Sequence, residues 1–204
     1  MLNKLGIKLF VKIRSIIFPF EKIIKYFPKN GVVLDVGCGH GTLSILLAKN
    51  LPESKFVGID PSIQKIKNAK HLSKGLSNIK FRCAYLKQVN KQKFDAIAIV
   101  DVACLMPPNE IIKLLLEAKK RLNKKGILIL KEVEKTNSAF YYFMLFEEFL
   151  MAKVFHLTFT NHTKTYLLSR SQYKELLHKA GFKIKTIKAI RGPLPYPHVL
   201  FICN

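Results

Sequence analysis

From residue 31 onward, continuous apolar runs alternate with stretches in which apolar residues recur every three or four positions. Runs of this kind predict strands buried on both faces, and the stretches between them predict helices. Strands that alternate with helices indicate an α/β fold with a mostly parallel sheet covered on both sides. The five expected strands are VVLDVG (32–37), KFVGID (55–60), IKFRCAYL (79–86), FDAIAIVDV (94–102) and ILILKEVE (127–134).

The remaining periodic segments complete this pattern. Helices are expected over 42–51, 61–73 and 108–126, and the run YKELLHKAGF (173–182) predicts a further helix that is stopped by Gly181. The runs KIKTIKAI and HVLFIC are joined by the short loop RGPLPYP, so they predict a C-terminal antiparallel hairpin that closes a seven-stranded sheet. Because the strand before it is parallel, this loop should lie at the carboxyl edge of the sheet.

Two segments depart from the alternation, and the first is N-terminal. Residues 1–30 contain a basic amphipathic helix interrupted near Pro19, with Lys4, Lys8 and Lys12 on one face. Its apolar face can cap the domain or lie in a membrane surface, and the two alternatives are compatible. The apolar positions are Leu2, Leu5, Leu9, Ile13, Ile16 and Phe20.

The second is an aromatic insert at 136–165, which follows the expected fifth strand. Aromatic residues crowd the stretch from Ser138 to Phe159. Core packing explains such a run, and so does an apolar substrate pocket or lid, because insertions at the carboxyl ends of strands border the ligand crevice of an open α/β sheet. Residues 31–204, including this insert, are expected to form one domain.

Charge and cysteine usage narrow the class of protein. The 204 residues carry a formal net charge of +22, mostly from lysine, which fits a solvated surface, an anionic membrane surface or nucleic acid, in falling order of preference. Four cysteines without paired spacing indicate neither a disulfide framework nor a metal site, so a cytoplasmic location is expected, with peripheral contact at the inner membrane face as an addition. No apolar run reaches the roughly 18 residues that a membrane span needs.

Candidate chemistry begins at the turn after the first strand. Gly37, Gly39 and Gly41 bring bare backbone amides and a helix N-terminus close to a ligand. Asp35 precedes this turn, and Asp60 ends the next strand, where a carboxylate can accept hydrogen bonds from two ribose hydroxyls. The pattern therefore predicts a site for a nucleotide-containing cofactor.

These segments resemble the class I S-adenosylmethionine-dependent methyltransferases, small bacterial types acting on lipids or hydrophobic metabolites among them. The similar motifs are VLDVGCGHG, FVGIDPS, FDAIAIVDVACLMPP and RLNKKGILILKEVE, in the family's order over about residues 31–204. The resemblance implies a Rossmann-like, doubly wound fold and S-adenosylmethionine as cofactor. It says almost nothing of the acceptor.

Carried over by position, the resemblance implies roles for particular residues. Asp35 is expected near the amino end of the methionine moiety, Asp60 at the ribose, and Asp101 with Val102 as a floor under the sulfonium. The full set of expected cofactor-binding residues is Asp35, Gly37, Cys38, Gly39, Gly41, Asp60, Pro61, Ala84, Tyr85, Asp101 and Val102.

Two features depart from the family pattern. Tyr85 stands where relatives often carry an acidic residue for the adenine amino group, so adenine recognition rests on backbone groups or the affinity is reduced. Relatives with LHHL after the fourth strand have no counterpart here, since the chain reads Ala103-Cys104-Leu105-Met106. There is also no N-P-P-[YF] motif, which argues against methylation of exocyclic base nitrogens.

Methyl transfer is an in-line displacement, and a general base is needed only for a protonated acceptor. The candidates near the carboxyl edge are His198, Glu132, Tyr166 and His162; Glu132 can equally pair with a lysine. The preferred acceptor is a hydrophobic small molecule or lipid-like compound at the membrane face. The alternatives are an RNA or protein methyltransferase, although nucleic acid is the less favoured partner, and a noncatalytic cofactor-binding or membrane-interaction module. The sequence does not predict an oligomeric state.

Overall fold

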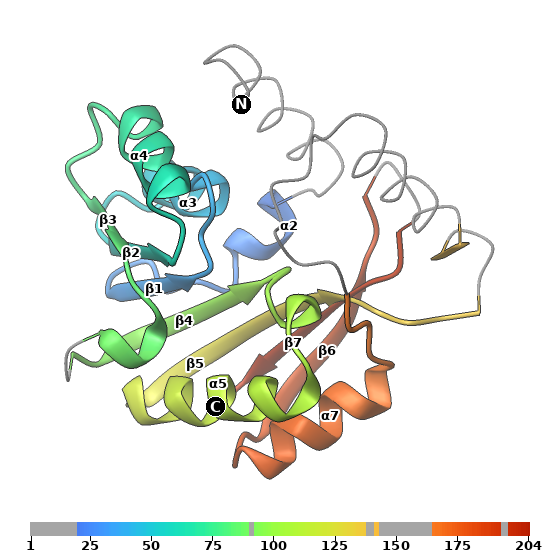
Figure 1. Cartoon of the computed structure of the whole chain (residues 1–204). Helices are drawn as coiled ribbons and strands as arrows, with labels where there is room; N and C mark the ends of the chain where they lie inside the picture. Colours follow the sequence, from blue (N-terminus) through green and yellow to red (C-terminus); the bar gives the residue numbers. More distant parts are fainter. Residues whose placement is uncertain (1–19, 90–91, 138–140, 143–164, 193–195) are drawn as a thin grey trace.

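The computed structural model describes residues 20–89, 92–137, 141–142, 165–192 and 196–204 (Figure 1). Within them the chain forms a seven-stranded sheet in the order β3-β2-β1-β4-β5-β7-β6. The first five strands are parallel neighbours, whereas β7 is antiparallel to both β5 and β6. The predicted α/β, Rossmann-like fold is therefore confirmed. The strands are β1 Val32–Val36, β2 Lys55–Asp60, β3 Ile79–Cys83, β4 Phe94–Val100, β5 Leu122–Val133, β6 Ile184–Ile190 and β7 His198–Cys203.

The C-terminal hairpin is confirmed, with one refinement of its position. Strand β7 lies between β5 and β6, so that β6 forms the edge of the sheet. The first residue of β7, His198, pairs with Val133 at the end of β5 and with Ile190 at the end of β6. The loop between β6 and β7 therefore starts and ends at the carboxyl edge, as predicted.

Helices cover both faces of the sheet (Figure 1). Three lie on one face: α2 Glu21–Ile24, α3 Thr42–Asn50 and α4 Ile63–Leu72. The other face carries α5 Pro108–Arg121 and α7 Arg170–Lys179. Short 3₁₀ helices, η1 Leu86–Gln88 and η2 Ala103–Leu105, follow β3 and β4.

Side-chain alternation in the strands produces two hydrophobic cores. In β4, Ile97 and Ile99 pack on the side of α5 and α7, whereas Ala96 and Ala98 pack on the side of α2, α3 and α4. Successive side chains of a strand point to opposite faces, so a strand covered on both sides is apolar throughout. This explains the continuous apolar runs of the sequence.

One predicted helix boundary is wrong. The helix expected to reach residue 126 ends at Arg121, and β5 begins at Leu122, which pairs with Phe94 of β4. The pairing register then shifts between Phe94 and Ala96, as in a β-bulge. Because a Cβ at Gly126 would lie 2.9 Å from the Phe94 carbonyl oxygen, this irregular start of the strand favours glycine.

The segment before β1 packs on the sheet domain. Phe20, Ile23 and Phe27 are buried in the core on the side of α3 and α4. For Phe20, a member of the predicted apolar face, this is the capping arrangement; residues 1–19, with Lys4, Lys8 and Lys12, lie outside the described residues. Of the aromatic insert, the structure describes a buried Tyr141 and an exposed Tyr142, while residues 143–164 are not described. No helix among the described residues is long and apolar enough to cross a membrane.

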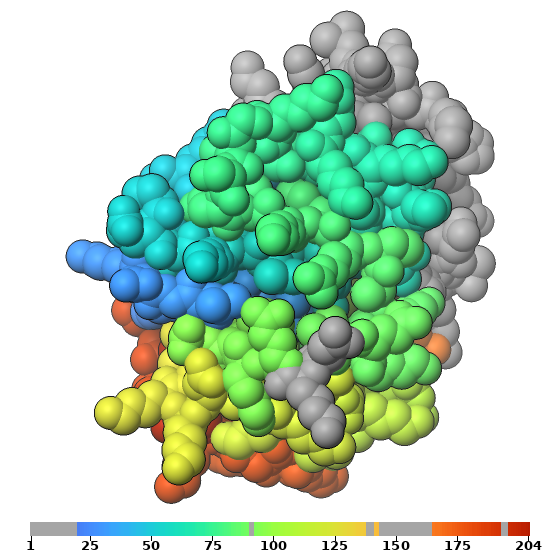
Figure 2. All heavy atoms as spheres, turned by 90° about the vertical axis from the view of Figure 1, so that its left-hand side faces the viewer, coloured from blue at the N-terminus to red at the C-terminus, as the bar shows by residue number. Residues whose placement is uncertain are grey.

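Figure 2 looks onto the end of the molecule where the parallel strands begin, with the start of β5 in yellow and the segment leading into β1 in blue. The carboxyl ends of β1, β2 and β4, which carry the predicted cofactor-binding residues, lie at the opposite end (Figure 1). In open α/β sheets, ligands bind outside the carboxyl ends of the strands. The candidate site is therefore sought at that edge.

Candidate functional site

The turn between β1 and α3 is held by the end of β2. The N–H groups of Gly37 and Cys38 both donate to the carbonyl oxygen of Ile59, at 2.8 and 3.0 Å, and Gly41 N–H donates to Cys38 O at 2.9 Å. Gly37, Gly39 and Gly41 all have positive φ angles, of 73°, 55° and 81°. Only glycine adopts such angles without strain, so the three glycines close the turn tightly over the sheet.

The three glycines differ in what surrounds them. A Cβ at Gly37 would lie 2.5 Å from a methyl carbon of Val102, and one at Gly41 would lie 2.7 Å from the ring of Phe81. A Cβ at Gly39 would meet nothing within 4 Å. Gly37 and Gly41 therefore serve packing as well as backbone conformation, whereas Gly39 faces open space, where a ligand can approach the bare backbone.

Asp60 joins the glycine turn to the loop after β2. Its Oδ2 accepts a hydrogen bond from Gly39 N–H at 3.1 Å, and its Oδ1 accepts one from Ser62 N–H at 2.8 Å. A carboxylate has about four lone-pair positions, so two acceptor positions are left for a ligand. The carboxylate predicted to bind ribose therefore lies beside the glycine that faces open space.

Asp35 lies deeper beneath the same turn. It is buried, and Ser44 of α3 donates its hydroxyl hydrogen to Asp35 Oδ2. Burial raises the pKa of Asp35 to about 6, with a smaller contribution from the charge of Asp60, while the Ser44 hydrogen bond opposes the shift. Burial also raises the pKa of the neighbouring Cys38 thiol, which keeps it neutral.

The ends of β2 and β3 form the adjacent part of the site. Ala84 N–H donates to Asp60 O at 3.2 Å, and Cys83 Sγ lies 3.3 Å from Pro61 O. Tyr85 and Ile63 follow these strands and are 58% and 62% exposed, which is unusual for large apolar side chains. Ile63, which was not predicted from the sequence as a site residue, is the first residue of α4 and presents an exposed apolar side chain close to the end of β2.

The end of β4 contains the one non-glycine residue with positive φ among the described residues, Asp101 at 56°. Its backbone N–H donates to Lys131 O at 2.9 Å, and its Oδ1 accepts from Lys131 Nζ at 2.6 Å. The Lys131 side chain is 0% exposed. A buried lysine on β5 therefore holds the segment predicted as the floor under the sulfonium, and its contact was not predicted from the sequence.

Glu132 was predicted as a catalytic candidate or as the partner of a lysine, but its carboxylate accepts hydrogen bonds from the backbone of the loop after β4. Its Oε1 accepts from Val102 N–H at 3.0 Å and from Ala103 N–H at 2.8 Å, and its Oε2 accepts from Cys104 N–H at 3.2 Å. The side chain is fully buried, and burial followed by the charge of Asp101 raises its pKa to about 7. These contacts give Glu132 a task in shaping the loop after β4.

Among the other catalytic candidates, His198 is the first residue of β7 and lies beside the end of β5. His198 is buried, with the ring of Tyr196 6.1 Å away in an edge-on arrangement. Tyr196 packs with Val133, Tyr141 and the partly buried Leu167 in a small apolar cluster, here called the edge cluster. Tyr166 is half-buried, and its N–H donates to Cys104 O at 2.7 Å. His162 lies outside the described residues.

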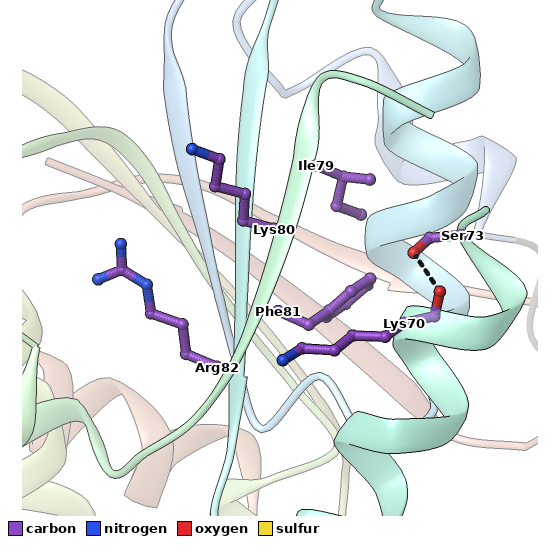
Figure 3. Close-up of a pocket in the computed structure, with 6 residues that line it drawn as sticks. All are labelled: Lys70, Ser73, Ile79, Lys80, Phe81 and Arg82. Atoms are coloured by element: carbon purple, nitrogen blue, oxygen red, sulfur yellow. Dashed lines mark hydrogen bonds between the residues drawn. The ribbon is translucent and has the colours of Figure 1, made fainter. Parts of the chain in front are cut away.

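A separate hollow lies between α4 and the edge strand β3. Figure 3 shows its lining residues, Lys70, Ser73, Ile79, Lys80, Phe81 and Arg82. Exposed basic residues on an edge strand are a common means of preventing unwanted pairing with other strands. This hollow contains none of the predicted cofactor-binding residues.

A glycine turn, a buried carboxylate beneath it and a second carboxylate at the end of the next strand define a Rossmann-like cofactor-binding protein. A family model described as a methyltransferase domain matches residues 28–181. The chain belongs to this methyltransferase family, whose cofactor is S-adenosylmethionine. The resemblance noted from the sequence motifs is confirmed.

Individual relatives agree with this assignment. A ubiquinone biosynthesis O-methyltransferase of Pelagibacter ubique is 30% identical over 141 residues, which cover 64% of this chain and 57% of the relative. An uncharacterized methyltransferase of Schizosaccharomyces pombe is 26% identical over 129 residues, which cover 58% of this chain and 46% of the relative. The matches thus span about half the length of these two relatives.

Solved structures of methyltransferases share the fold. The O-methyltransferase family 2 protein of Planctomyces limnophilus has a TM-score of 0.74 at 15% identity, covering 98% of this chain and 60% of its own. Magnesium protoporphyrin IX methyltransferase of Synechocystis has a TM-score of 0.68 at 20% identity, covering 98% and 83%. Both similarities concern the arrangement of strands and helices.

The geometry at the carboxyl edge fits S-adenosylmethionine. Gly39 leaves open space next to backbone, Asp60 retains acceptor capacity for ribose hydroxyls, and Asp35 offers a carboxylate on the same side. The individual roles of these residues remain predictions.

We expect S-adenosylmethionine affinity to fall as the pH drops below about 6. Asp35 is protonated there in the free protein, since burial has raised its pKa to about 6, and the cationic amino group of the cofactor favours the ionised form. Binding then requires proton release, which weakens it by up to roughly tenfold per pH unit. Isothermal titration at pH 5 to 8 measures the effect, and an Asp35→Asn variant should show a flatter profile; equal pH dependence in both proteins would contradict the assignment.

Proposed function

We propose that the protein transfers the methyl group of S-adenosylmethionine to a hydrophobic small molecule or lipid-like acceptor. The observation that carries the proposal is the edge cluster, a small group of buried apolar and aromatic side chains at the carboxyl end of β5, beside the first residue of β7. The buried Tyr196 hydroxyl within it makes no hydrogen bond to the described residues. A buried hydroxyl without a partner costs about 1 to 3 kcal/mol, which a polar group on an otherwise apolar acceptor would offset.

When bound, S-adenosylmethionine supplies an electrophilic methyl group to a lone pair of the acceptor. The residues of this chain orient that acceptor and exclude water. For a hydroxyl acceptor, the imidazole of His198 takes the proton as general base, and the Tyr196 ring packs edge-on against it. Tyr166 and His162 are the further candidates for contact with the acceptor. The Pelagibacter relative, named as an O-methyltransferase of ubiquinone biosynthesis, supports a hydrophobic acceptor.

We further propose that the acceptor is reached at a membrane surface. The basic amphipathic helix predicted within residues 1–30 would place Lys4, Lys8 and Lys12 against anionic headgroups, each contributing about 1 kcal/mol near the surface. The apolar face of the helix adds burial energy. This location would be peripheral, on the cytoplasmic side.

Incubation with methyl-labelled S-adenosylmethionine and with separate lipid, RNA and protein fractions tests these proposals. We expect label in the lipid fraction, presented in vesicles that contain anionic lipid. A Lys4, Lys8, Lys12→Glu triple variant should label vesicle-bound acceptor much less while its S-adenosylmethionine affinity stays unchanged.

Other outcomes identify the alternatives. Label in RNA or in protein would show that the acceptor is not a lipid. A short match of 58 residues, 41% identical and covering 28% of this chain, to a tRNA (guanine-N(7)-)-methyltransferase of Rubrobacter xylanophilus makes the RNA fraction a necessary part of the experiment. Equal labelling by the triple variant would leave a dissolved apolar metabolite as the better acceptor. Tight cofactor binding without label in any fraction would favour a noncatalytic module.

A further inference from the structure

Near its carboxyl end, β5 carries two adjacent charged residues, Lys131 and Glu132, whose side chains point to opposite sides of the sheet. Lys131 continues the face of Ile129, toward α2, α3 and α4, and Glu132 continues the face of Leu128 and Leu130, toward α5 and α7. Both side chains are fully buried. Together they contact four consecutive residues of the neighbouring strand end, Asp101 through Cys104.

The Glu132 carboxylate makes an unusual number of bonds to one short loop. Three consecutive backbone N–H groups, from Val102 to Cys104, donate to its two oxygens at 2.8 to 3.2 Å. Val102 also packs against Gly37 in the glycine turn, since a Cβ there would lie 2.5 Å from its Cγ2. The loop that Glu132 holds is thus in contact with the cofactor side of the site.

The same loop contacts the acceptor side. The Cys104 carbonyl accepts a hydrogen bond from Tyr166 N–H at 2.7 Å, and the next residue, Leu167, packs on the edge cluster. Asp101, directly before the loop, is held at a positive φ of 56° by Lys131. A non-glycine residue in this conformation persists only when its surroundings determine it strongly.

We infer that Glu132 is a positioning residue that ties the loop Val102–Cys104, beside the glycine turn, to Tyr166 beside the edge cluster, so that cofactor binding sets the geometry of the acceptor side. This inference rests on the proposed function, because it assumes that the cofactor and the acceptor occupy these two sides. A carboxylate suits the task because it is an acceptor only, and it faces three donors.

Protonation should weaken this connection. The charge of Asp101 acts on the carboxylate and raises its pKa, the charge of Lys131 acts on it in the opposite direction, and Tyr173 of α7 interacts electrostatically with Glu132 from the covering helix. Burial and the charge of Asp101 raise the pKa of Glu132 to about 7, so the carboxylate gains a proton as the pH falls through neutrality. Its acceptor capacity for the loop then falls.

The test uses amide signals of the ¹⁵N-labelled full-length protein during titration with S-adenosylhomocysteine. In the wild type we expect the Tyr166 amide signal to shift with saturation, and the shift to shrink as the pH falls from 8 to 6. Glu132→Gln retains the shape but places an NH₂ group against donors. We therefore expect its Val102, Ala103 and Cys104 amides to exchange about 10- to 100-fold faster and its Tyr166 response to be lost at every pH.

Glu134→Gln is the matched control, because Glu134 lies two residues further along and pairs with Arg170 at 2.7 Å instead of with the loop. It should keep the Tyr166 response. A full Tyr166 response in Glu132→Gln, or a pH-independent response in the wild type, would overturn the inference; the wild-type titration decides even if the variant does not fold. Absence of S-adenosylhomocysteine binding to the wild type would instead count against the proposed function.

Discussion

Replacement of Gly39 by valine should abolish detectable S-adenosylmethionine binding, a loss of more than about 100-fold, in a protein that still folds. The φ angle of 55° is strained for a β-branched residue, and the new side chain would point into the open space beside the turn. That space is where the backbone must approach the cofactor. Isothermal titration measures binding, and thermal unfolding measures the accompanying loss of stability.

Gly75 supplies the matched control. It has a φ angle of 91°, and a Cβ there would also meet nothing within 4 Å, but it lies in the turn after α4, far from the carboxyl edge. Gly75→Val should therefore lose a similar amount of stability and keep its affinity. If Gly39→Val folds and binds as the wild type does, the glycine turn is not the cofactor site.

The strands of the sheet could be predicted because strands buried on both faces appear in the sequence as continuous apolar runs. A run such as that of β4, with Ala96 to Ile99 all buried, has no other explanation in a chain that alternates with helices. The start of β5 was missed because Asn123 to Gly126 continue the polar composition of the helix end. The start of β5 is a strand because it pairs with β4 at Phe94. This contact joins distant parts of the chain, so the local sequence pattern does not predict it.

The candidate site divides in the same way. The glycines and Asp60 were predicted because a strand, a tight turn and a helix start are contiguous, and each needs particular residue types there. The partners of Lys131 and Glu132 were not, because they lie 28 to 30 residues away on another strand end. A buried polar side chain can satisfy its hydrogen bonds with any nearby group, so its partner depends on the assembled fold.

Asp60→Ala should weaken S-adenosylmethionine binding by roughly 1.5 to 3 kcal/mol, about 10- to 150-fold, because the ribose hydroxyls lose a charged acceptor. The structure offers a second explanation for such a loss, since Asp60 also holds Gly39 N–H and Ser62 N–H. Asp95→Ala controls for stability alone: Asp95 also accepts two hydrogen bonds, one from the backbone N–H of Val32 and one from the Asn123 side chain, where β1 and β5 begin.

A double-mutant cycle separates the two explanations. S-adenosylhomocysteine and its analogue without the two ribose hydroxyls are titrated into the wild type and into Asp60→Ala. If Asp60 binds the hydroxyls, the analogue should bind both proteins almost equally, because it lacks the two hydroxyls that would donate hydrogen bonds to Asp60. If Asp60 acts only by shaping the turn, the substitution should weaken both ligands by the same factor. Unchanged affinity for S-adenosylhomocysteine in Asp60→Ala would contradict both explanations and remove Asp60 from the cofactor site.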